Sequence, residues 1–98
     1  MVMFDLPVMN LSERKAASLF RNDLLDMGFQ MTQLSVYVRF CGGKSHAETF
    51  CKKVESILPK GGKVNILQFT DKQYEKIISY HGKNKKIKNK TPNQFNLF

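Results

Sequence analysis

The carboxylates are the first residues in the chain to consider for catalysis, and Asp5 is the one whose position needs an explanation. Asp5 directly follows the apolar run of residues 2–4, where an ionised group is costly unless it is paired or lies at an exposed strand end. It could accept backbone donors in the turn that leads to Pro7, or it could bind a metal ion. The remaining carboxylates singled out by their positions fall at predicted helix caps or on solvated helix faces: Glu13, Asp23, Asp26, Glu48 and Asp71.

A single carboxylate is a poor Mg²⁺ site, because the ion is usually held by one or two carboxylates together with water and phosphate oxygens. A two-fold homodimer would present two copies of Asp5 across its axis. Metal-assisted phosphodiester hydrolysis is then conceivable. Asp5 is therefore the candidate catalytic and metal-binding residue, with Mg²⁺ at the dimer axis as the expected cofactor. His46 and His81 are expected to be ordinary surface residues.

Basic residues give the strongest compositional signal. The chain has 16 Lys and Arg against 8 Asp and Glu, a formal net charge of +8 and a pI near 9.7, which favours a polyanionic partner. Arg14, Lys15 and Arg21 share a predicted helix, and Arg39 follows Tyr37 on a predicted strand. We predict that these four cations contact the phosphates of a duplex without reading its bases.

The C-terminal residues differ in character from the rest. Lysines dominate residues 83–90, which predicts a flexible basic linker. Residues 94–98 then alternate polar and apolar side chains, a pattern that can add a strand to a sheet edge. The predicted partner-binding residues are Phe95, Leu97 and Phe98. The strand that they form could join a sheet of its own protomer, of the second protomer or of a different protein, and the sequence does not choose among these. The predicted organisation is a domain of residues 1–82 and a tail of residues 83–98.

Hydrophobic periodicity predicts the elements that position these residues. A buried strand ends near Asp5, and a helix over residues 11–27 is capped by Asn10 and ended by Gly28. Residues 29–41 are extended and long for one strand; a break near Ser35 would give two strands, but the sequence alone does not place it.

The second half of the chain also has clear signals for where its helices and strands begin and end. Ser45 and Glu48 form a predicted capping box for a second helix, which stops before Pro59. A strand over residues 64–69 follows, and Thr70 or Asp71 caps a short helix that runs through Tyr80.

This order predicts an α+β protein with the βαββαβ plan of the ferredoxin-like fold. A chain of 98 residues forms one domain with a thin core, so a homodimer interface is a natural place to bury more surface. Cys41 and Cys51 are expected to be reduced thiols in a cytoplasmic protein. No apolar run approaches the roughly 20 residues of a membrane span, and the start lacks the features of a signal peptide, so we expect no membrane association.

Taken in order, the motifs resemble the Cas-two family, the small CRISPR-associated proteins of spacer acquisition. The start, the Thr-Asp-Lys-Gln motif and the Gln-x-Asn-Leu-Phe end look most like the form that accompanies type II CRISPR systems. The matching residues are Val2-Met3-Phe4-Asp5-Leu6-Pro7, Glu13-Arg14-Lys15, Phe20-Arg21, Gly28-Phe29-Gln30-Met31 with Gln33, Ser35-Val36-Tyr37 with Arg39, Leu58-Pro59 with Gly62, and Thr70-Asp71-Lys72-Gln73.

The resemblance implies a ferredoxin-like homodimer that binds the duplex middle of a prespacer and bridges two dimers of the CRISPR integrase subunit, with the tail strand helping to dock the integrase. Many members of the family are described as Mg²⁺-dependent endoribonucleases or DNases, and Asp5 matches the family's acidic residue at the end of the first strand. The leading hypothesis is therefore a DNA-binding adaptor. The alternative is a metal-dependent nuclease acting on RNA or DNA through paired Asp5, and the third is an RNA-binding or regulatory module.

Overall fold

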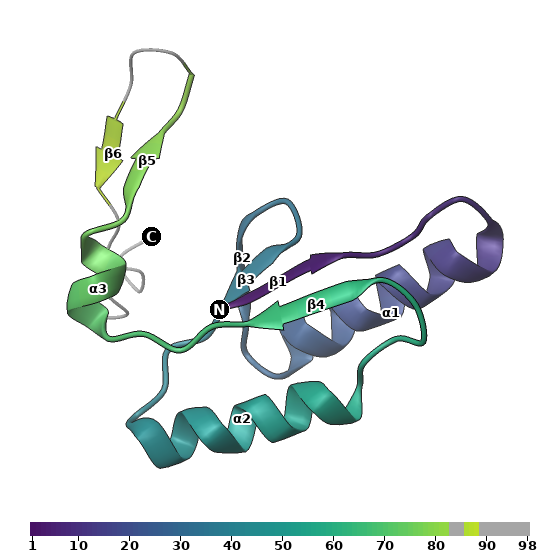
Figure 1. Ribbon diagram of the computed structural model, residues 1–98, viewed down its shortest axis with the longest axis horizontal. Coiled ribbons are helices and arrows are strands. Elements are labelled where there is room, and N and C mark those ends of the chain that lie inside the picture. The colour runs from purple at the N-terminus through teal and green to yellow at the C-terminus, as the bar shows by residue number, and fades with distance from the viewer. Residues whose placement is uncertain (83–85, 89–98) are drawn as a thin grey trace. The chain divides into compact units, whose positions relative to one another are not determined.

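The computed structural model describes residues 1–82 and the backbone of residues 86–88 (Figure 1). The chain divides into two compact units, Met1–Leu67 and Gln68–Phe98. The predicted organisation into residues 1–82 and a tail of residues 83–98 stays a prediction, because most of that tail lies outside the described residues.

The first unit is a four-stranded antiparallel sheet with two helices, in the order β1, α1, β2, β3, α2, β4. The strands lie side by side as β2-β3-β1-β4. This order and sheet confirm the predicted α+β ferredoxin-like plan. The elements are β1 (Val2–Asp5), α1 (Leu11–Asp26), β2 (Gln30–Gln33), β3 (Val36–Val38), α2 (Lys44–Ser56) and β4 (Lys63–Ile66).

Both helices pack against the same face of the sheet. Val2 and Phe4 of β1 lie in one hydrophobic cluster with Phe20 of α1 and Phe50 of α2. The rings of Phe4 and Phe20 meet edge to face with centroids 5.1 Å apart, a favourable aromatic geometry. The other members of the cluster are Leu24, Phe29, Tyr37 and Val54.

Strand β1 is buried on this face only. Met3 is 38% exposed and Asp5 is also exposed, because successive side chains of a strand point to opposite faces. The prediction of a wholly buried strand is therefore wrong for Met3: its apolar side chain lies on the face of the sheet that neither helix covers.

Helix α1 begins and ends where the sequence predicts. The side chain of Asn10 accepts a hydrogen bond from the backbone N–H of Glu13, whose own carboxylate accepts from the Asn10 backbone N–H. This capping box satisfies two backbone donors of the first turn. After the last turn Gly28 has a φ of 89°, which a glycine adopts without strain.

The predicted capping box of the second helix is wrong. Helix α2 begins at Lys44 with Gly43 as its N-cap, and no side chain caps it. Ser45 therefore lies within the helix, where its carbonyl oxygen accepts a hydrogen bond from the Thr49 hydroxyl at 3.0 Å. The end of α2 at Ser56, shortly before Pro59, agrees with the prediction.

The predicted break in residues 29–41 is confirmed. Strands β2 and β3 form a hairpin with Ser35 in its turn, at a φ of 60°. The Ser35 carbonyl oxygen accepts a hydrogen bond from the Phe4 N–H at 3.1 Å, which fastens the turn to β1.

In the second unit, Thr70 caps the short helix α3 (Asp71–Glu75) through a capping box with Gln73. One prediction is wrong here: the helix does not run through Tyr80, because β5 (Ile78–Tyr80) follows it. Strand β5 pairs antiparallel with β6 (Lys86–Lys88), which lies within the stretch predicted to be a basic linker. Among the described residues, no helix is long and apolar enough to cross a membrane.

Candidate functional site

Asp5 lies at the end of β1, exposed on the face of the sheet opposite to Val2 and Phe4. Within residues 1–82 and 86–88 its carboxylate has no hydrogen bond or ion pair, so the predicted contact with backbone donors of the following turn is not formed. An exposed carboxylate pays little desolvation penalty. The Asp5 oxygens are therefore available to a cation or to a second chain.

The backbone of Asp5 is held by its neighbour strand. Asp5 pairs with Lys63 of β4 in the antiparallel register, directly after the turn at Gly62. Gly62 has a φ of +83°, and a Cβ atom there would lie 2.6 Å from the Asp5 carbonyl oxygen and 2.8 Å from Leu6 Cδ2. Only glycine satisfies both the positive φ and this close approach, so Gly62 is a positioning residue for Asp5.

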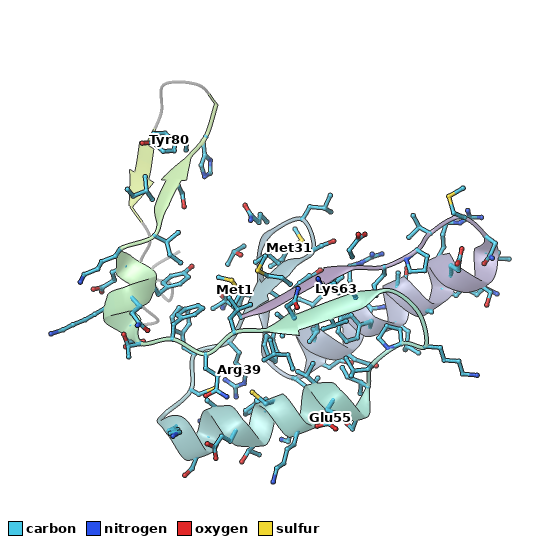
Figure 2. All side chains as sticks on the ribbon, in the orientation of Figure 1. Met1, Met31, Arg39, Glu55, Lys63 and Tyr80 are labelled. Carbon is cyan, nitrogen blue, oxygen red and sulfur yellow. The ribbon has the colours of Figure 1, made fainter. Side chains whose placement is uncertain are left out.

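Lys63 is a residue that the sequence reasoning missed. Its register position opposite Asp5 places a cation on the residue paired with the strand-end aspartate, although the two side chains form no ion pair in the described part of the chain. Figure 2 labels Lys63 at the start of β4. The one signal in the sequence was its place immediately after the Gly61-Gly62 turn, and strand pairing could not be read from that.

The described part of the chain has no group of three or more His, Cys, Asp or Glu side chains that could hold a metal ion. At the end of β1 a single chain therefore offers one carboxylate, that of Asp5, and its predicted role in binding Mg²⁺ stays a prediction. Cys41 and Cys51 are both half-buried, and the Cys41 thiol donates to the Arg39 carbonyl oxygen at 3.9 Å. The Nδ1 atom of His46 accepts a hydrogen bond from the Gly42 backbone N–H at 2.9 Å, which gives this histidine a structural role.

Three of the four predicted nucleic-acid-binding cations lie on α1. Arg14 and Lys15 are exposed, whereas Arg21 is half-buried and donates to the Ser18 hydroxyl at 3.1 Å. Arg14 and Arg21 are seven residues apart, two helical turns, and so lie on one flank of the helix about 10 Å apart along its axis. Lys15 extends this cationic row around the helix.

Arg39 is placed differently. It follows the end of β3 and is half-buried between the sheet and α2 (Figure 2). Its guanidinium carbon lies 4.0 Å from the centroid of the Phe50 ring, and Nη1 donates to the Phe40 carbonyl oxygen at 3.1 Å. The ammonium of Lys53 lies 4.6 Å from the same ring centroid. The contacts of Arg39 are thus made within the protein, and it is not part of the α1 row.

The uncovered face of the sheet carries both polar and apolar side chains. Met3 pairs with Val36 on one side and with Asn65 on the other, so these three residues share the face that carries Asp5 and Lys63. Val36 is buried, whereas the other side chains named on this face are exposed and available for contact with another molecule. The predicted partner-binding residues Phe95, Leu97 and Phe98 lie outside the described residues.

Comparison with known proteins gives a consistent result. The sequence model for the family described as "CRISPR associated protein Cas2" matches residues 1–77. A protein of Paracidovorax avenae is 60% identical over 97 residues, covering 99% of this chain and 90% of the relative. Relatives from Flavobacterium psychrophilum (43% identical, 100% of this chain, 85% of the relative) and Ligilactobacillus salivarius (46%, 91% and 89%) are similar at nearly full length. All three are named CRISPR-associated endoribonuclease Cas2.

Proposed function

This chain belongs to the Cas2 family of CRISPR-associated proteins, and on that premise we propose that it is the adaptor subunit of a spacer-acquisition complex, a homodimer that binds prespacer duplex DNA and bridges integrase dimers. The motifs at both ends of the chain favour the form that accompanies type II systems.

The observation that carries this proposal is the cationic row on α1. Arg14 and Lys15 are exposed on the first turns and Arg21 is half-exposed two turns beyond Arg14. Cations at this spacing suit phosphates along a duplex and supply affinity without base recognition. In this proposal, the main role of Arg39 is structural, because its guanidinium packs over the Phe50 ring. A contact between Arg39 and a phosphate would have to compete with that packing.

The test of duplex binding is its dependence on salt. Binding of a fluorescent duplex should weaken steeply between about 50 and 200 mM salt, because each neutralised phosphate adds about 0.9 to the log–log slope. Replacing Arg14, Lys15 and Arg21 with Gln should reduce both the affinity and the slope. An affinity that does not change with salt would contradict the electrostatic basis of the proposal.

The uncovered face of the sheet is the proposed homodimer interface. The exposed side chain of Met3 lies on it beside Asp5, so a two-fold axis through this face would bring two copies of Asp5 together and bury the Met3 side chain. Sedimentation of the purified chain at micromolar concentration should report a dimer. A monomer at all accessible concentrations would contradict the adaptor, which needs two copies to bridge two partners.

Metal-dependent cleavage of RNA or DNA is a second candidate function, favoured by the exposed Asp5 carboxylate and by the name of the relatives. Two Asp5 carboxylates in the dimer would hold Mg²⁺, which would polarise a phosphodiester. Asp5→Ala should then abolish Mg²⁺-dependent cleavage and leave duplex binding and spacer integration intact, whereas Asp26→Ala on the exposed side of α1 is the matched control. If Asp5→Ala folds but fails in integration, the nuclease replaces the adaptor as the leading function.

We also propose that residues 94–98 dock the integrase through Phe95, Leu97 and Phe98, because alternating apolar side chains suit addition of a strand to a sheet edge. Deletion of these residues should weaken capture by the integrase far more than it weakens duplex binding. Capture that is unchanged by the deletion would assign integrase docking to another surface.

A further inference from the structure

The loop between β1 and α1 presents apolar side chains to solvent. Met9 is 87% exposed, the highest value among the large hydrophobic residues of the described chain, and Val8 and Leu11 beside it are 51% and 59% exposed. Nothing in the proposed function so far uses these side chains. Contiguous apolar groups on a surface commonly mark a contact with another molecule.

This loop is firmly held. The carboxylate of Glu13 accepts the backbone N–H groups of Met9 and Asn10 at 3.0 and 3.1 Å. The Arg14 guanidinium reaches back to the carbonyl oxygens of Val8 and Met9 at 3.4 and 3.5 Å. The helix that positions the cationic row therefore also fixes the Met9 backbone, so the entropy lost when Met9 binds a partner is mainly that of its exposed side chain.

The surroundings of Met9 indicate the chemistry of its partner. Arg14 touches the loop itself and Lys15 is exposed on the next residue of the helix. Proteins that bind the minor groove of DNA combine cations on the phosphates with an apolar side chain that enters between base steps, and methionine is one of the residues used. An apolar pocket of a protein partner would accept Met9 but would leave the neighbouring cations without a counterpart.

We propose that Met9 is a minor-groove wedge, which enters the duplex while Arg14 and Lys15 hold the flanking phosphates. The inference rests on the proposed duplex binding and adds a contact with the bases to it. Such a wedge unstacks a base step, so binding is favoured where the step is easily deformed.

The experiment uses the full chain and duplexes that carry 2-aminopurine at successive positions, whose fluorescence rises when the base is unstacked. The wild type and Met9→Leu should raise the fluorescence at the bound step, and Met9→Ala should not. Met9→Ala should also lower the affinity by about threefold to tenfold, as expected when part of a methionine's apolar surface is removed. Its salt slope should stay unchanged because the cations that bind the phosphates are all still present.

Met31→Ala is the matched control, because Met31 is also an exposed methionine, 58% exposed, but lies on β2. It should leave both the fluorescence and the affinity at wild-type values. Thermal unfolding of each variant checks that folding is preserved, as expected for exposed side chains.

The outcomes separate the wedge from the function on which it rests. If the wild type binds duplex DNA without raising the fluorescence, the wedge is wrong and the adaptor stands. If the wild type binds no duplex at low salt, the proposed function itself fails. If Met9→Ala reduces capture by the integrase and leaves the fluorescence and duplex affinity unchanged, the loop binds protein, and the wedge is overturned.

Discussion

The two compact units of the chain, Met1–Leu67 and Gln68–Phe98, differ in how they divide apolar side chains and charge. All eight residues of the buried hydrophobic cluster belong to the first unit. The second unit has seven lysines against Asp71 and Glu75, so it supplies most of the excess positive charge from about a third of the chain. Folding stability is thus expected to depend on the first unit, and long-range attraction to nucleic acid to depend strongly on the second.

The largest effect should come from the core of the first unit. Phe20 is 1% exposed and meets Phe4 edge to face, so Phe20→Ala should lower the free energy of unfolding by about 3–5 kcal/mol. Ile78 in the second unit is 59% exposed, and Ile78→Ala should change it by no more than about 0.5 kcal/mol. Urea denaturation measures both. Comparable losses for the two variants would show that stability is shared between the units.

A smaller loss is expected at the turn that positions Asp5. Gly62→Ala forces a Cβ atom against the Asp5 carbonyl oxygen at a positive φ and should cost about 2–4 kcal/mol. Gly61→Ala is the matched control, because a Cβ there meets Pro7 Cγ at an ordinary 3.7 Å. Both are measured by denaturation. If Gly62→Ala is as stable as Gly61→Ala, the backbone around Asp5 yields easily and Asp5 is less firmly held than these distances imply.

Replacing lysines of the second unit tests whether its positive charge contributes to duplex binding. Replacing Lys83, Lys85, Lys86, Lys88 and Lys90 with Gln should lower duplex affinity about tenfold or more. It should also reduce the salt slope by about 0.9 for each phosphate that is no longer neutralised. Unfolding should change little, because the hydrophobic cluster lies in the first unit. A Gln variant with unchanged affinity, measured by fluorescence anisotropy, would show that these five lysines do not contribute to DNA binding.

The smallest effect separates two arginines of the first unit. Arg39→Gln removes the cation over Phe50 and should cost about 1 kcal/mol of stability, with little change in duplex affinity. Arg21→Gln should do the reverse and lower the salt slope. Equal losses of duplex affinity for the two variants would show that Arg39 binds DNA, as the sequence predicts.

Local features could be predicted from the sequence wherever neighbouring residues decide the structure. The Asn10–Glu13 capping box and the positive φ of Gly28 just after α1 both follow from residues within a few positions of each other. The length of residues 29–41 predicted a break between two strands but did not fix its position. Alternation and helical periodicity were also enough for the βαββαβ order and for Asp5 at the end of its strand.

Tertiary structure alone decided the rest, because the deciding contacts join residues far apart in the chain. The sequence predicts Arg39 as a DNA-binding cation on a strand, but its guanidinium packs over the ring of Phe50 in the second helix. Lys63 stands opposite Asp5, and Gly62 against its backbone, only because β4 pairs with β1. The lysine-rich composition of residues 83–90 predicted a linker, yet residues 86–88 within it pair with β5. Strand preference depends on the neighbours across the sheet, and those neighbours are not apparent from the local composition.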